Sequence, residues 1–115
     1  MRNCALTLSL LLWLVVPAYS HAILLSATPT MGEVCQGPNV PIKLRFNSRV
    51  DAGRSRLILV APDGEQGMLA ISGISTPDSL VAQAKGLRRG LYVLRWQVLA
   101  GDGHISRGEV KFLVH

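Results

Sequence analysis

The sequence has little of what many protein functions require. Two cysteines, three methionines and two each of Phe, Tyr and Trp occur among its 115 residues. Its lysines and arginines form no run interleaved with aromatic side chains, which argues against nucleic-acid binding. No activated nucleophile, paired carboxylates or phosphate-binding loop is apparent either. These absences predict a protein that is not an enzyme and does not bind nucleic acid.

A hydrophobic run long enough to span a membrane is also missing. The apolar stretch at residues 5–16 has about 12 residues, whereas a transmembrane helix needs about 20. Arg2 precedes this stretch, and the small residues Ala18 and Ser20 follow it, as in a secretory signal peptide. We therefore predict a cleavable signal peptide at residues 1–20 and a secreted product without stable membrane insertion. An uncleaved membrane anchor is the alternative.

Cleavage would leave one domain, residues 21–115, that begins with His21. Its charge is +4, because the signal removes one of the twelve basic residues and none of the seven acidic ones. A weak attraction to anionic membrane surfaces or acidic partners stays open. With Cys4 removed, Cys35 is the only cysteine of the domain, so the apolar core must hold the fold without an intramolecular disulfide. We expect Cys35 to be a structural thiol, and a soft ligand for Cu(I) is the alternative.

Short stretches of alternating apolar and polar residues follow residue 20, whereas helical periodicity is hard to find. Turn-forming Gly, Pro, Asn, Asp and Ser residues separate these stretches. The expected strands are residues 42–46, 56–60, 92–98 and 109–114, with weaker candidates at 22–27, 68–72 and 79–84. About seven short strands predict an all-β fold, a single immunoglobulin-like Greek-key β-sandwich.

Two aromatic residues are expected to be structural. Leu87, Gly90 and Tyr92 form an L-x-x-G-x-Y pattern at the start of the most apolar strand. Greek-key proteins place a tyrosine at this position, and its hydroxyl bonds back to the backbone. Trp96 lies two pleats farther along the same face, so it is expected in the core.

Two of the three histidines occupy positions that favour metal binding. After cleavage His21 would offer its α-amine and a ring nitrogen, which can close a chelate ring on one metal ion. His104 follows Asp102 and Gly103 in a turn sequence, and the Asp-Gly pair tolerates the positive φ of a tight hairpin. If the backbone there is extended, the side chains of Asp102 and His104 lean to the same side and can meet one ion. His115 is expected to be a frayed end.

These groups would together supply three nitrogen ligands and one carboxylate oxygen. A tetragonal set of nitrogen and oxygen ligands without thiolate suits Cu(II), whose affinity is also the highest of the divalent series. Zn(II) is the main competitor because it accepts the same ligands in tetrahedral geometry. We therefore predict one Cu(II) per chain, held by His21, Asp102 and His104.

A larger set of residues matches the pattern of a known family. The set consists of His21-Ala22, Ser26, Pro29, Gly32, Pro41 to Phe46, Gly90-Leu91-Tyr92-Val93, Trp96, Asp102-Gly103-His104, Gly108, Phe112 and Val114. In these residues the chain resembles the CopC-type copper-resistance family of periplasmic copper-binding proteins. The resemblance implies a Greek-key sandwich in the periplasm, with a Cu(II) site made by the amine and ring of His21, Asp102 and His104. It also implies a role in copper homeostasis, in which the protein sequesters copper or passes it to a membrane copper transporter or another periplasmic copper protein.

Two departures from the family pattern bear on this site. Some members bind Cu(I) through a methionine-rich loop, but only Met31 and Met68 follow residue 20, so we predict no high-affinity Cu(I) site. Many members have an acidic residue after the phenylalanine near Phe46, where this chain has Asn47. If that acid supports the ligands, its absence lowers the affinity for copper.

Two other functions are compatible with the sequence. Immunoglobulin-like sandwiches also serve as adhesion or assembly domains, in which the histidines would be incidental. An N-terminal histidine that shares copper with a second histidine is also the arrangement of copper-dependent polysaccharide monooxygenases. Asp102 argues against such an enzyme, because it would occupy an equatorial position that oxygen activation needs open.

Overall fold

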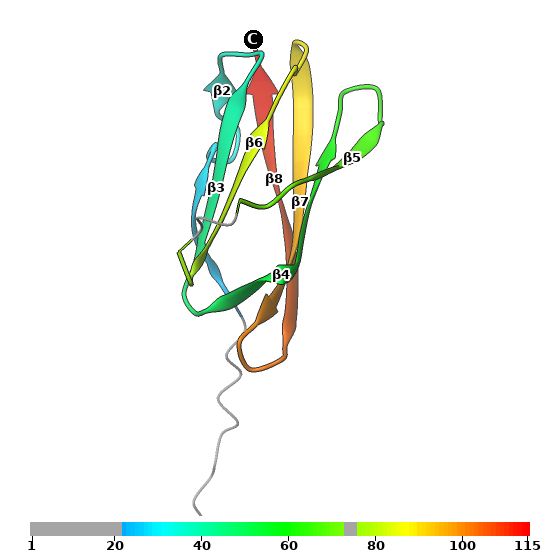
Figure 1. Cartoon of the computed structure of the whole chain (residues 1–115). Helices are drawn as coiled ribbons and strands as arrows, with labels where there is room; N and C mark the ends of the chain where they lie inside the picture. Colours follow the sequence, from blue (N-terminus) through cyan, green and yellow to red (C-terminus); the bar gives the residue numbers. More distant parts are fainter. Residues whose placement is uncertain (1–21, 73–75) are drawn as a thin grey trace, which may run out of the picture.

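The computed structural model describes residues 22–72 and 76–115, and this part of the chain forms two stacked β-sheets (Figure 1). The strands are β1 (Leu24–Thr28), β2 (Val34–Cys35), β3 (Val40–Phe46), β4 (Val50–Val60), β5 (Gln66–Leu69), β6 (Ser79–Ala84), β7 (Gly90–Ala100) and β8 (Ile105–Val114). The strand order is β1-β3-β6 in one sheet and β2-β8-β7-β4-β5 in the other. The predicted all-β sandwich is confirmed. No helix within the described residues has the length and apolar character needed to cross a membrane.

Alternating side chains of the two sheets face one another and form the core. In β3 every second residue from Val40 to Phe46 is buried, and the residues between them are exposed. β7 and β8 pair over ten positions, from Gly90 opposite Val114 to Leu99 opposite Ile105. Burial of these apolar faces is the main source of stability in a domain whose described residues include a single, unpaired cysteine.

The two aromatic predictions are confirmed. Tyr92 is buried, and its hydroxyl accepts a hydrogen bond from the Arg88 N–H at 2.9 Å and donates one to the Arg88 carbonyl at 3.0 Å. Trp96 is buried opposite Gly108, where a Cβ atom would overlap the indole ring. The Trp96 ring meets Phe46 of the other sheet edge-on, with centroids 5.2 Å apart. Gly108 therefore leaves the space that Trp96 needs to connect the two sheets.

Several strands have other bounds than expected, and β8 begins four residues early, at Ile105. In three strands the difference has a clear structural cause. β2 was not expected, because a strand of two residues carries no alternation, and it pairs in parallel with the edge of β8. β4 begins at Val50 and not at residue 56, since a bulge between Asp51 and Arg56 interrupts the alternation. The Ser55 hydroxyl stabilises this bulge by donating a hydrogen bond to the Asp51 carbonyl at 2.6 Å. β5 begins two residues before the expected range 68–72, and as a largely exposed edge strand it shows no apolar face.

The two ends of the sandwich carry different loops (Figure 1). One end, here named the hairpin end, carries the β7–β8 hairpin, the β3–β4 loop and the beginning of β1. The opposite end, named the C-terminal end, carries the last residue of the chain and the β4–β5 and β6–β7 loops. The predicted signal peptide at residues 1–20 and the predicted ligand His21 lie outside the described residues.

Candidate metal centre

The β7–β8 hairpin positions Asp102 and His104 at the hairpin end. The Gly103 N–H donates to the Ala100 carbonyl at 2.9 Å, and the Ala100 N–H donates to the His104 carbonyl at 2.8 Å. Gly103 has a φ of +91°, a conformation that favours glycine. The tight turn predicted from the Asp-Gly pair is thereby confirmed.

Asp102 and His104 contact each other directly. Oδ1 of Asp102 accepts the backbone N–H of His104 at 3.1 Å, and Oδ2 lies 2.9 Å from Nδ1 of the His104 ring. The expectation that the two side chains lean to the same side is therefore right, but an extended backbone is not the reason. The backbone forms a turn, and the Asp102 side chain folds back onto the residue two positions later, as Asp does in Asx-turns.

This pair offers a carboxylate and an imidazole that a metal ion can reach. The side chains of Asp102 and His104 are 31% and 50% exposed. The 2.9 Å between Oδ2 and Nδ1 is the length of a hydrogen bond, and either atom could instead bind an ion. The pair therefore supplies one oxygen and one nitrogen of the predicted ligand set, which both Cu(II) and Zn(II) accept.

The chain enters the fold at the same end of the sandwich. Ala22 is buried in the core. The Ile23 N–H donates to Oδ1 of Asn47 at 2.8 Å, and the Asn47 N–H donates to the Ile23 carbonyl at 3.0 Å. Two residues later, the Arg49 carbonyl accepts the Gly101 N–H at 3.0 Å. The β3–β4 loop thus connects the first residues of the domain to the hairpin.

His21, the third predicted ligand, directly precedes Ala22 and lies outside the described residues. Within residues 22–72 and 76–115, no group of three or more His, Cys, Asp or Glu side chains could hold a metal ion. The described residues thus bring together two of the three predicted ligands, and the role of His21 stays a prediction. Sequence reasoning noted Asn47 only as the place of a missing acid. Its contacts with Ile23 join residues 24 positions apart, and no local pattern reports them.

His115 and Cys35 lie at the C-terminal end. The ten residues of β8 span about 33 Å between His104 and His115. The His115 N–H donates to the Cys35 carbonyl at 2.9 Å, and the His115 carbonyl accepts the Gly37 N–H at 3.3 Å, so the expected fraying is wrong for its backbone. Cys35 is a half-buried free thiol, and burial together with the nearby Glu33 carboxylate raises its pKa. A raised pKa disfavours the thiolate and supports a structural role.

Comparison with known proteins places the chain in a family. The model of the CopC domain matches residues 24–115, which is most of the sequence. The chain belongs to the CopC domain family. Among curated protein sequences, none matches it.

Solved structures of CopC proteins are similar to this CopC domain. CopC from Methylosinus trichosporium OB3b is 29% identical, with a TM-score of 0.73 over 82% of this chain and 93% of that one. PcoC from Escherichia coli, a methionine-rich copper resistance protein, is 22% identical, with a TM-score of 0.67 over 84% of this chain and 100% of that one. Fibronectin(III)-like modules of Clostridium thermocellum CbhA are 19% identical, with a TM-score of 0.52 over 83% of this chain and 46% of that one. The last two likenesses concern the fold alone.

Proposed function

We propose that the mature protein begins at His21 and carries one Cu(II) ion in the periplasm, bound by the amine and ring of His21 together with Asp102 and His104. The observation that supports this most is that the β7–β8 hairpin brings the side chains of Asp102 and His104 into contact at the surface. Membership of the CopC domain family supports a role in copper resistance.

Each ligand has a distinct part in this proposal. The His21 amine and ring chelate the ion, and the Asp102 carboxylate offsets part of its charge. The nitrogen ligands bind copper in their deprotonated forms, so affinity falls as the pH is lowered. Asp102 and His104 are partly exposed, which suits a site that passes its ion to a membrane copper transporter or another periplasmic copper protein.

Burial of the aromatic residues argues against a polysaccharide monooxygenase. Phe46, Tyr92, Trp96 and Phe112, the aromatic residues in the described part of the chain, all lie in the core. That part of the surface therefore offers no aromatic ring on which a sugar could stack. The site is better suited to holding copper than to oxidising a polysaccharide.

Electron paramagnetic resonance of the secreted protein with one equivalent of Cu(II) tests the site. We expect nitrogen hyperfine coupling that changes in His21→Ala and in His104→Ala, because each substitution removes one of the three nitrogen ligands. One extra residue ahead of His21 should also change the spectrum, because it converts the amine into a peptide nitrogen. His115→Ala is the matched control, since it removes a histidine at the opposite end. An unchanged spectrum in His104→Ala would overturn the proposed site.

Mass spectrometry of the secreted protein tests the processing on which the site depends. The proposal requires a mature mass that starts at His21. A secreted chain that retains residues 1–20 would have the His21 nitrogen in a peptide bond to Ser20. That result would remove the amine from the ligand set.

A further inference from the structure

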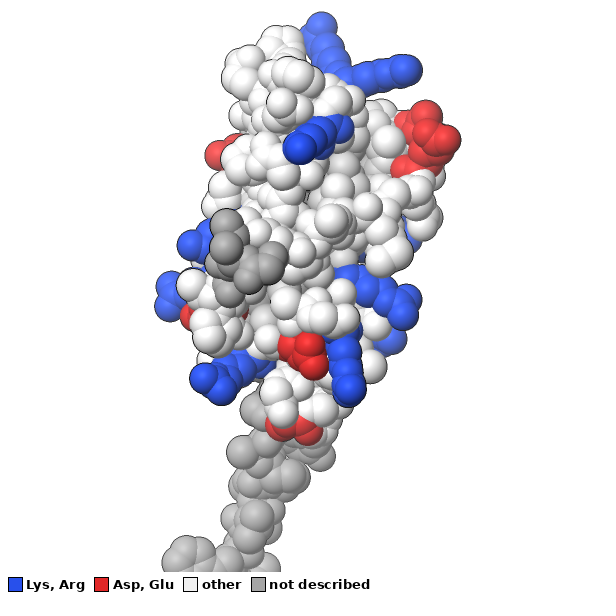
Figure 2. Space-filling view, viewed as in Figure 1, with Lys and Arg blue, Asp and Glu red and all other residues white. Residues whose placement is uncertain are grey.

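The outer face of the five-stranded sheet, which is the side turned away from the core, concentrates positive charge. Its cross-strand rows are Arg56, Gln97 and Arg107; then Met68, Ile58, Arg95 and Glu109; then Val60, Val93 and Lys111. Four cations and one carboxylate give these rows a charge of +3, whereas all described residues together carry +4. In the view of Figure 2, by contrast, basic and acidic side chains are scattered among uncharged ones. Strand register thus gathers arginines that are far apart in the sequence.

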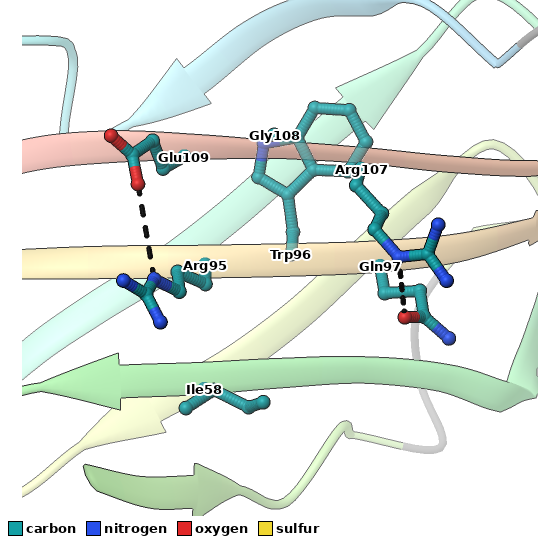
Figure 3. Close-up of a pocket in the computed structure, with 7 residues that line it drawn as sticks. All are labelled: Ile58, Arg95, Trp96, Gln97, Arg107, Gly108 and Glu109. Carbon is teal, nitrogen blue, oxygen red and sulfur yellow. Dashed lines mark hydrogen bonds and ion pairs between the residues drawn. The ribbon is translucent and has the colours of Figure 1, made fainter.

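An open pocket of about 420 Å³ lies on this face, between two of its arginines (Figure 3). Nε of Arg95 lies 3.9 Å from the Glu109 carboxylate, and Nε of Arg107 donates to Oε1 of Gln97 at 2.9 Å. Both contacts use Nε, and the two guanidinium groups lie on either side of the pocket (Figure 3). Ile58 contributes an apolar wall from the neighbouring strand β4. The pocket is thus lined by two arginines, the Glu109 carboxylate and an apolar side chain.

The same face exposes large apolar side chains, in a row separated from the pocket by Val93 and Lys111 and on the edge strand β5. Val34, Leu113 and Leu91 are neighbours across β2, β8 and β7, and their exposed fractions are 61%, 40% and 48%. Met68 is opposite Ile58 on the edge strand β5 and is 69% exposed. Apolar groups gathered on one face beside charged ones are typical of a protein interaction surface.

The chemistry of this face selects an acidic occupant. Two copies of this face, each with a charge of +3, would repel each other. A guanidinium group can bind a carboxylate through two parallel hydrogen bonds, and the Nε contacts of Arg95 and Arg107 leave their terminal nitrogens to do so. A flat lipid surface would meet the cations but would not enter the pocket between them.

We propose that this outer face docks an acidic, partly apolar segment of a partner protein, with a carboxylate seated between Arg95 and Arg107. The apolar side chains of the segment cover the row of Leu91, Leu113 and Val34. None of these residues is a predicted copper ligand, so this docking surface and the proposed copper site can each be tested without the other.

Amide chemical shifts test the proposal. They are measured on the ¹⁵N-labelled, copper-free secreted protein during titration with a synthetic peptide of alternating Glu and Leu. The shifts should concentrate on β7, β8 and the second half of β4, and a peptide of alternating Lys and Leu should cause none there. Arg107→Glu should weaken binding of the Glu–Leu peptide about tenfold. Lys43→Glu, the same charge change on β3 of the other sheet, should weaken it by less than about twofold.

Three results would overturn the proposal. Equal weakening by Arg107→Glu and Lys43→Glu would mean that net charge alone attracts the peptide. Absence of shifts at millimolar peptide would mean that the face does not dock such a segment. Binding to phosphatidylglycerol–phosphatidylcholine vesicles without binding of the peptide would assign the face to a membrane. A native amide spectrum for each variant separates loss of binding from loss of fold.

Discussion

Strand β7 has a hydrogen-bonded side chain at either end, and the two differ in burial. At its start, the Tyr92 hydroxyl exchanges two partly buried hydrogen bonds with the backbone of Arg88 at the edge of the core. Just beyond its end, the Asp102 carboxylate contacts the backbone and ring of His104 at the surface. Each contact is local in sequence, yet the first is partly buried and the second is exposed.

Burial decides what each of these contacts can do. Loss of the Tyr92 hydroxyl would leave the Arg88 N–H without its partner at a partly buried position, so this contact contributes to stability. Water can replace either partner of the Asp102–His104 pair, so that contact contributes little to stability. We therefore expect substitutions at the structural end of β7 to lower the free energy of unfolding more than those at its proposed binding end.

The largest effect on the free energy of unfolding is expected for a substitution near the middle of β7, at the contact between Trp96 and Gly108. Gly108→Val places a branched side chain where the Trp96 indole packs, and the displaced ring would lose its contact with Phe46. We expect the free energy of unfolding to fall by about 3 kcal/mol, measured by urea denaturation. The exposed change Ile105→Val in the same strand is the control, with an expected loss below about 0.5 kcal/mol. Equal losses in both variants would contradict the role assigned to Gly108.

Tyr92→Phe should affect the structural end alone. It removes both hydrogen bonds to Arg88 and keeps the ring that stacks on Phe112. The expected loss is about 1–3 kcal/mol in the free energy of unfolding. The Cu(II) resonance spectrum should not change, because the hydroxyl lies at the C-terminal end. A changed spectrum would break the division between the two ends.

Gly103→Ala should affect both stability and copper binding. Its φ of +91° is costly for alanine, so we expect a loss of about 1 kcal/mol and a weaker Cu(II) affinity, because the turn sets Asp102 against His104. Gly32→Ala is a matched control: its φ is +79°, and a Cβ at either glycine meets nothing within 4 Å. Denaturation and calorimetric titration should show a similar stability loss in both variants and weaker copper binding in Gly103→Ala alone. Weaker copper binding in both would argue against a local effect of the turn.

Asp102→Asn should have the smallest effect on stability. An asparagine oxygen can still accept the His104 N–H, so the free energy of unfolding should stay within about 0.5 kcal/mol of the original. Calorimetric titration should nevertheless show Cu(II) affinity lowered by about tenfold or more, because the carboxylate charge is lost. Unchanged affinity would assign Asp102 to the turn alone.

The sequence predicts those strands whose two faces differ in polarity. β3, β7 and β8 alternate over several residues, so their buried faces are visible without knowledge of their neighbours. β2 exists only because Val34 and Cys35 pair with the edge of β8, and the first half of β4 follows a bulge at Asp51. Such features depend on pairing between distant segments, which alternation does not report.

In the candidate site, too, local features were predicted from the sequence and non-local ones were not. The Asp-Gly turn and the contact between Asp102 and His104 are local, and they were predicted from residue types and spacing. The hydrogen bonds of Asn47 to Ile23 are not local and were missed. The basic residues form no run along the sequence, and only the strand register brings Arg56, Arg95 and Arg107 onto one face.

The burial of Ala22 has a consequence for how such a protein evolves. This residue directly follows the proposed first ligand in the sequence and is only 3% exposed, so packing in the interior fixes Ala22 itself. Substitutions in the core would then alter the strength with which copper is held, even when every ligand is retained. Two homologues with identical ligands would differ in affinity for reasons that an alignment of their binding residues does not display.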